Sequence, residues 1–359
     1  MKKTILHFIY NLGRGGAEMM MVKVIDELKD YNNIVVTLFP ENHFGAELTC
    51  EKYFCLNVKS FFLLPKAVFQ LKKIIRENKV DIVHSHLFWP TIIARLATPR
   101  KIPLVTTIHA FIAKSVEYRN LHIRMLDRIT FHFRKSVIIA VAKGALEEYF
   151  SFLNLKPYKA YSLYTFVDLK QFNESCATAK LSSDRTIRLV TVGALRLQKN
   201  HLFLLNAFKY LRDEDIQLDI YGSGPLHSSM EQVIRDEGLK VELKGEVRNI
   251  NHVICKYDLF VMSSTFEGFS LSVLEAMAMN VPLLLSDIKS FREQCECTAS
   301  YFDLGDEKEF LLKLKLLLSN RSHMLDISEK AKKRARENFT LEKHMSGLRR
   351  IYSELNVQN

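Results

Sequence analysis

Two glutamates at a spacing of eight, Glu267 and Glu275, are the residues best suited to bind a polar ligand. An apolar run at 259–264 precedes them and is typical of a buried strand, and Ser270 between them favours the start of a helix. The first-turn N–H groups of that helix, at 269–272, lack an internal acceptor and attract an anion. The carboxylates could accept hydrogen bonds from hydroxyl groups of a phosphate-bearing ligand. The expected binding residues here are Glu267, Gly268, Phe269, Ser270, Leu271 and Glu275.

Two basic side chains follow an earlier strand of the same half. Arg196 and Lys199 lie in a loop that starts at Gly193. A guanidinium offers a planar fork of donors and an ammonium a compact charge, and both suit a diphosphate. A second tight loop, which contains Gly222, also leads from a strand into a helix. We therefore expect both loops to contribute to the same anion-binding site.

The first half offers a glycine turn and a histidine. Gly15 and Gly16 follow the first expected strand, and glycine lets the backbone approach a ligand closely. Their spacing is not the dinucleotide fingerprint, because Glu18 stands where its third glycine is required, and no phosphate-binding P-loop is present. His109 ends another expected strand, at the same edge of the sheet. Alone, each feature is also typical of a tight turn or a structural histidine.

A metal site is not expected. His84 and His86 end the strand beside that of His109, and three histidines suggest a metal cluster. His-x-His on one strand directs both rings to one face, but no acidic ligand is apparent nearby.

Strand and helix patterns alternate twice along the chain. Compact β-branched runs predict strands, and amphipathic stretches between them predict helices. Two such series predict an α/β protein with two doubly wound Rossmann-like domains, whose strand ends face a central cleft. A polar segment near 167–185 resembles a linker, and 307–355 reads as a helical tail. The expected strands are 4–10, 33–39, 80–86, 103–109, 136–142, 187–193, 216–222, 239–245, 259–264 and 281–287, and the expected helices are 18–29, 65–77, 120–134, 200–212, 226–237 and 270–279.

Composition narrows the class of protein further. Residues 1–168 contain 24 Lys and Arg against 14 Asp and Glu, so the net charge of +11 resides almost wholly in this half. The asymmetry indicates an anionic partner, or else a solubility bias without one. No apolar run approaches the length of a membrane span, and the start reads as a strand instead of a signal peptide. We expect a cytoplasmic protein whose six scattered cysteines are free thiols.

Together, EGFSLSVLEAMAMNVPLLLSD, VGALRLQKN and the early GGAE resemble the family-4 retaining glycosyltransferases (group 1), over essentially the whole chain. The resemblance implies the GT-B fold, with an acceptor domain at 1–168, a nucleotide-sugar donor domain at 169–340, and a helix at 341–359 that packs back on the first domain. It implies transfer of a sugar from a UDP- or GDP-sugar to a hydroxyl group with retention of configuration, and no cofactor or metal. It also implies the site residues: His109, Glu267, Arg196 and Lys199 for catalysis, and Gly15, Gly16, Gly193, Arg196, Lys199, Gly222, Glu267, Gly268, Phe269, Ser270, Leu271 and Glu275 for the donor.

Some positions depart from the family pattern. Asn280 stands where glycine is frequent, and Lys289-Ser290-Phe291 replaces a usual Gly-Gly, which leaves the local phosphate contacts open. Asp213-Glu214-Asp215 matches the metal-binding Asp-x-Asp motif. It precedes a strand instead of following one, so we interpret it as a solvated turn.

The acceptor is indicated only by the basic first half. Residues 111–135 interleave arginine and lysine with apolar side chains, and 61–76 have a similar character. We interpret them as stretches that dock on an anionic membrane surface, toward a lipid-linked glycan. An ordinary helix with a solvated basic face explains the pattern equally well.

Two other functions remain alternatives. A sugar-nucleotide epimerase would share the fold and the diphosphate site. A nucleic-acid-binding protein would explain the charge but would leave Glu267 and Glu275 without a role, because carboxylates repel phosphates, so no specific nucleic acid is expected.

Overall fold

The computed structural model describes residues 2–58, 60, 63–172, 186–247 and 249–356. The chain forms two compact units, Met1–Thr165 together with His344–Asn359, and Phe166–Lys343. The linker predicted near 167–185 falls largely on residues outside the described ones.

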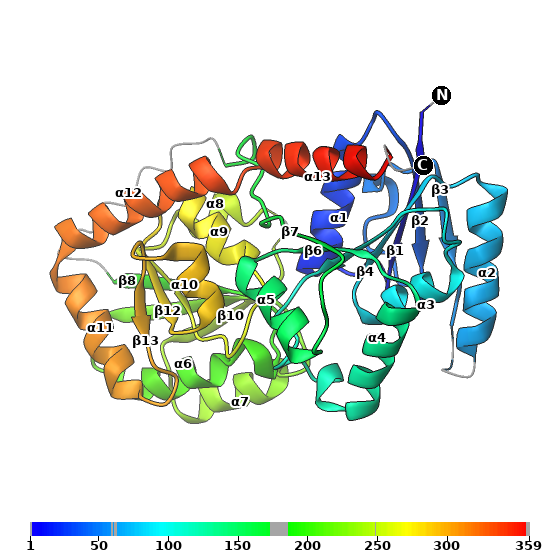
Figure 1. Cartoon of the computed structure of the whole chain (residues 1–359). Helices are drawn as coiled ribbons and strands as arrows, with labels where there is room; N and C mark the ends of the chain where they lie inside the picture. The colour runs from blue at the N-terminus through cyan, green and yellow to red at the C-terminus, as the bar shows by residue number, and fades with distance from the viewer. Residues whose placement is uncertain (1, 59, 61–62, 173–185, 248, 357–359) are drawn as a thin grey trace. The chain divides into compact units, whose positions relative to one another are not determined.

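Seven parallel strands form the sheet of the first unit (Figure 1). Their order is β3-β2-β1-β4-β5-β6-β7, so the chain order reverses between β1 and β4. The strands are β1 (Thr4–Ile9), β2 (Asn32–Thr37), β3 (Lys52–Cys55), β4 (Ile82–His86), β5 (Leu104–Ile108), β6 (Val137–Ala140) and β7 (Lys159–Ser162). The helices are α1 (Gly16–Glu27), α2 (Leu64–Glu77), α3 (Phe88–Ala97), α4 (Leu121–Phe133) and α5 (Lys143–Phe152).

Alternation along β1 and β2 sorts the apolar side chains to two faces of this sheet. Leu6 and Phe8 pack in one core cluster with Leu71 of α2. Ile9 packs in another with Met21 of α1. The sheet is therefore covered on both faces, as the continuous apolar strands predict.

Six parallel strands form the second sheet, in the order β10-β9-β8-β11-β12-β13. This is the strand order of a Rossmann sheet, with its reversal between β8 and β11. The strands are β8 (Ile187–Val192), β9 (Ile216–Tyr221), β10 (Val241–Gly245), β11 (Leu259–Met262), β12 (Leu283–Ser286) and β13 (Ser300–Phe302). The helices are α6 (His201–Phe208), α7 (His227–Asp236), α8 (Asn251–Ile254), α9 (Leu271–Ala278), α10 (Lys289–Cys295), α11 (Glu307–Ser319) and α12 (Arg321–Asn338).

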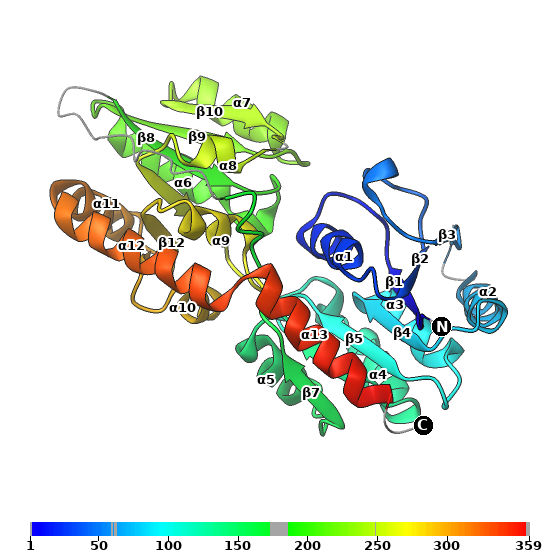
Figure 2. The same cartoon turned by 90° about the horizontal axis from the view of Figure 1, so that it is seen from above.

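The predicted helical tail consists of α11, α12 and α13 (Leu341–Asn356), seen from above in Figure 2. Most of α13 belongs to the first unit, where Arg349 donates to the Glu27 carbonyl at 2.7 Å and the Tyr352 hydroxyl lies 2.7 Å from Nδ1 of His84. Among the described residues, no helix combines the length and apolar character that a membrane span requires.

The fold class is confirmed. Every predicted strand is present, with its ends within two residues of the predicted ones, whereas β3, β7 and β13 were not predicted. The expectation of free thiols is wrong for Cys255, which is disulfide-bonded, while Cys50, Cys55, Cys295 and Cys297 are free. Scattered spacing carries no information on which cysteines meet in the fold.

Candidate active site

The candidate donor residues lie at the point where the strand order of the second sheet reverses. Leu259 of β11 pairs with Leu189 of β8, and the loops that follow these two strands therefore leave the sheet side by side. Ligands of open α/β sheets bind at this switch point, outside the carboxyl ends of the strands.

Lys199 and Glu267 meet there in an ion pair. The Lys199 ammonium donates to Oε1 of Glu267 at 2.7 Å, and the Ser264 hydroxyl donates to the same oxygen at 2.7 Å. The Glu267 side chain is buried, with 9% of its surface exposed, and that of Lys199 is 17% exposed. Burying an isolated charge to this extent costs free energy, so each charge stabilises the buried position of the other.

Hydrogen bonds between the two loops fix the pair. The Ser263 hydroxyl donates to the Asn200 carbonyl at 2.9 Å, and the Thr265 amide donates to the Gln198 carbonyl at 2.9 Å. Gln198 donates in turn to the Phe266 carbonyl at 2.9 Å. The segment that carries Lys199 is thus bonded to the segment that carries Glu267.

Glycine is required where the Gly222 loop meets the Gly193 loop. Gly222 has φ +144°, and a Cβ atom there would lie 2.1 Å from the Gly193 carbonyl oxygen. A Cβ on Gly193 would lie 3.0 Å from Cε of Lys199. The two glycines therefore let three chain segments approach closely around the lysine.

Ser270 is confirmed as the N-cap of α9, and its hydroxyl accepts from the Val273 amide at 3.5 Å. The Ser270 amide, one of the predicted anion-binding groups, donates instead to Oε1 of Gln294 at 3.1 Å. The amides of Leu271 and Ser272 belong to the first turn, where no earlier helical carbonyl is available to them. Gln294 was not predicted, because its role arises from the packing of α10 on α9.

Glu275 is half-buried on α9, and burial raises the pKa of its carboxyl from the ordinary 4.5 to about 8. Within the described part of the chain, no group donates a hydrogen bond to this carboxyl. A ligand hydroxyl that donated here would therefore supply an interaction that the protein itself does not.

Arg196 is exposed, and among the described residues its guanidinium has no acidic partner. Further along, Arg292 forms a bidentate ion pair with Asp287 at 2.7 and 2.6 Å and stacks on Tyr301, 3.8 Å from the ring centre. The segment at 289–293, whose sequence departs from the family pattern, thus lies in helix α10, and its arginine is already paired.

Asn280 follows the end of α9 with φ +60°. This left-handed conformation is the one that glycine favours after a helix and that asparagine tolerates. Asp213-Glu214-Asp215 is confirmed as an exposed turn ahead of β9, and Glu214 pairs with Lys315 at 2.9 Å.

The first unit holds the remaining predicted residues. Gly15 is the N-cap of α1, and Gly16 is its first residue. His109 follows β5, and its Nε2 lies 3.0 Å from Nδ1 of His86. Burial and the nearby His344 lower the pKa of His109 to about 3, so the ring is neutral at physiological pH.

Comparison with known proteins identifies the class. A model of Glycosyltransferase Family 4 matches residues 14–171, and one of Glycosyl transferases group 1 matches residues 186–320. The chain belongs to this family of retaining glycosyltransferases, whose fold is GT-B. The structure of Anabaena HepE in complex with UDP and glucose superposes with a TM-score of 0.83 over 97% of this chain and 99% of that one, at 16% identity, which shows the shared fold.

Two curated relatives have named activities. One is the N-acetylgalactosamine-N,N'-diacetylbacillosaminyl-diphospho-undecaprenol 4-alpha-N-acetylgalactosaminyltransferase of Campylobacter jejuni, 26% identical over 92% of this chain and 94% of its own. The other is the UDP-Gal:alpha-D-GlcNAc-diphosphoundecaprenol alpha-1,3-galactosyltransferase of Escherichia coli, 24% identical over 89% and 92%.

The raised pKa of Glu275 predicts a pH dependence of stability. Folding retains the proton that the unfolded chain loses above pH 4.5, so the contribution of this group is full below that pH and falls as pH rises to about 8. The glutamine of the Glu275→Gln variant stays neutral at every pH, so this variant does not lose stability through this group as pH rises. We expect its Tm to equal that of the wild type near pH 4.5 and to exceed it by roughly 2–4 °C or more at pH 8.5. That difference corresponds to about 1 kcal/mol, the part of the linkage free energy that we retain after solvent screening of a half-buried carboxyl.

Differential scanning fluorimetry across this pH range measures the difference. Glu231→Gln, at an exposed carboxylate on α7, is the matched control and should show no such trend. An equal Tm difference for Glu275→Gln at both ends of the range would contradict the raised pKa of this carboxyl.

Proposed function

We propose that the chain moves a sugar from a UDP- or GDP-sugar to a hydroxyl group of a lipid-linked glycan, as a step of cell-surface polysaccharide synthesis. The names of the relatives support a diphosphoundecaprenol-linked acceptor, and that of the E. coli relative supports a UDP-sugar donor. The observation that carries the proposal is the Lys199–Glu267 pair at the switch point of the second sheet.

The second unit would bind the donor. Lys199 and the exposed Arg196 would neutralise the diphosphate, together with the N-terminus of α9. Glu275 would accept hydrogen bonds from the ribose, and Glu267 would face the transferred sugar. Gly193 and Gly222 keep the surrounding backbone close to Lys199, which leaves no room for larger side chains there.

Departure of the nucleoside diphosphate would limit the reaction, and preorganised positive charge stabilises that departure most. Lys199 is already held in place before a donor arrives, so little reorganisation is needed. We favour a front-face route in which the leaving phosphate accepts the acceptor's proton. The neutral ring of His109 would then contribute hydrogen bonds beside the sugar without adding charge.

The first unit would bind the acceptor, with Gly15 and Gly16 bringing backbone near it. Its α4 presents an apolar stripe at a spacing of four residues, made up of Leu121, Met125, Ile129 and Phe133, all exposed. Side chains spaced by four lie on one face of a helix. Exposed apolar stripes on a basic helix insert at the boundary of an anionic bilayer.

Only some of the charged residues near the α4 stripe are free to face a membrane. Arg124 stacks over the Phe152 ring at 4.7 Å, and Arg134 donates to the Ile102 carbonyl at 2.6 Å, so both serve the fold. Asp127 is buried against Arg95 at 2.5 Å. Arg128 and Lys135 are exposed, and they flank the α4 stripe with positive charge.

Two parts of the predicted basic stretches do not contribute to such a surface. Phe111, Ile112 and Phe131 are buried in the core. Phe61 and Phe62 lie outside the described residues. The stripe on α4 is therefore the surface we propose for the inner leaflet of the membrane, where a cytoplasmic donor and a lipid-linked acceptor meet.

Thermal-shift screening against UDP- and GDP-sugars tests the donor site, because a bound donor raises Tm by linkage. We expect one nucleotide class to raise the Tm of the wild type, and Lys199→Ala and Glu275→Ala each to lose that shift. Lys209→Ala is the matched control, since Lys209 pairs with Glu237 at 3.0 Å on the surface of the same unit. A full shift in both site variants would refute the assignment, and a converted sugar nucleotide without acceptor would favour an epimerase.

Flotation with liposomes tests the docking surface. We expect binding to vesicles that contain phosphatidylglycerol, and at least a tenfold loss when Met125, Ile129 and Phe133 are replaced by serine, since each removes roughly 1.5–3 kcal/mol of apolar burial. Leu312→Ser with Leu316→Ser, on exposed positions of α11, is the matched control. Unchanged binding of the α4 variant would leave an ordinary solvated helix as the correct interpretation.

A further inference from the structure

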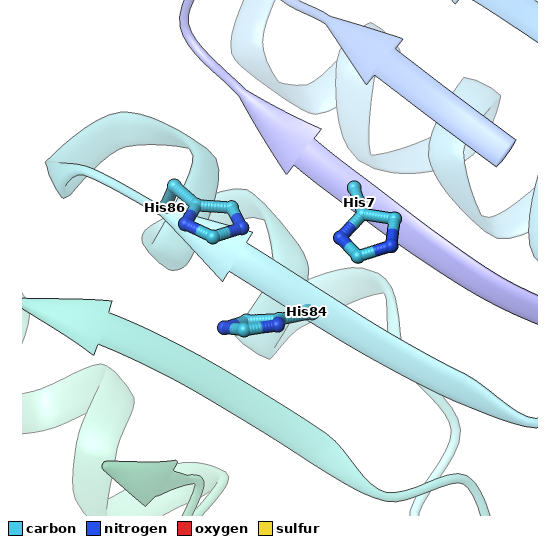
Figure 3. Close-up of side chains that lie close together, drawn as sticks. All are labelled: His7, His84 and His86. Carbon is cyan, nitrogen blue, oxygen red and sulfur yellow. The ribbon is translucent and has the colours of Figure 1, made fainter. Parts of the chain in front are cut away.

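Three buried histidines converge on one face of the first sheet. His7 of β1 pairs in register with His84 of β4, and His86 follows two residues later on the same face. One ring nitrogen of each residue lies within 4.8 Å of the others. Figure 3 shows His7 and His86 with ring nitrogens turned toward one another beside His84. His84 and His86 stand out in the sequence, whereas His7 joins them only through strand register, which local sequence does not show.

The hydrogen bonds of Asn33 fix the proton of His7. The Asn33 side-chain amide donates to the Leu28 carbonyl at 2.9 Å, so its oxygen Oδ1 faces Nε2 of His7 at 3.2 Å. Nε2 must therefore carry the proton and donate. Nδ1 of His7 then presents a bare lone pair, which is buried and has no hydrogen-bond partner among the described residues.

His86 also directs an unpartnered nitrogen into the interior. Its Nδ1 lies 3.0 Å from Nε2 of His109, and its Nε2 is buried with no partner in the part of the chain that the structure describes. His84 has a hydroxyl on each side, Tyr352 at Nδ1 and Thr107 at Nε2, both at 2.7 Å. Only Thr107 can withdraw its oxygen, by rotation about χ1, so Nε2 is the nitrogen of His84 that can bind another partner.

A small cavity lies against the three rings. It has a volume of about 10 Å³, the space of a single water-sized body, and is lined by all three histidines. The rest of its lining is mostly apolar, with Thr107 and His344 as the polar members. The apolar members are Met20, Met21 and Val24 of α1, Leu348 of α13, Ile139 of β6 and Leu163. The two rings whose Nδ1 (His7) and Nε2 (His86) lack a hydrogen-bond partner among the described residues thus both line this cavity.

We propose that His7, His84 and His86 bind one transition-metal ion of the Zn²⁺ class. Neutral imidazoles are preferred ligands of this class. Tetrahedral Zn²⁺ with bonds of about 2.0–2.1 Å separates its ligand nitrogens by roughly 3.4 Å, so small rotations of the rings suffice. The fourth position is open to hydroxide, which lowers the net charge of the ion in its apolar surroundings.

The hydrogen bonds around the rings suit this role. Metal-bound histidines donate their second N–H to an oxygen or nitrogen acceptor, which fixes the ring. His7 has Asn33 in that position, and His84 has a hydroxyl. An ion on Nε2 of His86 leaves the proton on Nδ1, where it donates to Nε2 of His109. The site therefore also sets the tautomer of His109.

Metal content and Co²⁺ absorption test the site without any reference to sugar transfer. After chelator treatment and loading with Zn²⁺ or Co²⁺, we expect one ion per chain and the visible absorption of four-coordinate Co²⁺ with nitrogen ligands. His7→Phe and His86→Phe should each weaken metal binding by more than about 100-fold. Loss of a residue that only hydrogen-bonds to a metal ligand already weakens binding by up to about 100-fold. His201→Phe is the matched control, because His201 is a buried histidine of the other unit whose Nδ1 also lacks a partner within the described ranges.

The variants are compared with the wild type by thermal unfolding in the presence of chelator, which shows whether they fold. If either fails to fold, the Co²⁺ spectrum of the wild type decides alone. A wild-type chain without bound ion, or with six-coordinate Co²⁺ only, would overturn the proposal and leave one bridging water in the cavity. Undiminished binding in folded His7→Phe and His86→Phe would overturn it equally.

Discussion

The ion pair between Lys199 and Glu267 is the contact on which the candidate donor site depends. A buried charge needs a partner, and here the two charges come from loops that follow β8 and β11. Their pairing draws both loops to the switch point, where Ser264 completes the contacts of the carboxylate. Position 222 requires glycine because the neighbouring backbone lies too close for any side chain.

The switch point of the first sheet, between β1 and β4, differs from that of the second sheet in its electrostatics. Where the second unit places opposite charges, the first places neutral imidazoles, and burial keeps them neutral: it lowers the pKa of His7 to about 4 and that of His86 well below its usual range. In the proposed reaction, a neutral His109 would lie beside a developing positive charge on the sugar without repelling it. The two switch points thus differ in electrostatics while sharing one topology.

Local patterns made much of this predictable. Apolar β-branched runs located the long strands, and Ser270 marked the helix start, because burial and capping act within a few residues of sequence. The strand at 159–162 was not predicted, because it is short and only partly buried at the sheet edge. The contact of Lys199 with Glu267, and the register that brings His7 to the other histidines, join distant segments. Neither leaves a trace in local sequence.

The most direct measurement is the turnover of Glu267→Gln, followed as release of nucleoside diphosphate from the donor that the screen identifies. Glutamine keeps the shape and can retain the bond from Ser264, but it removes the charge that, in the proposed reaction, faces the sugar. A catalytic Glu267 predicts that kcat falls by about 10²-fold or more, while donor affinity changes by less than tenfold. A variant with the kcat of the wild type would contradict the placement of the reacting sugar at this pair.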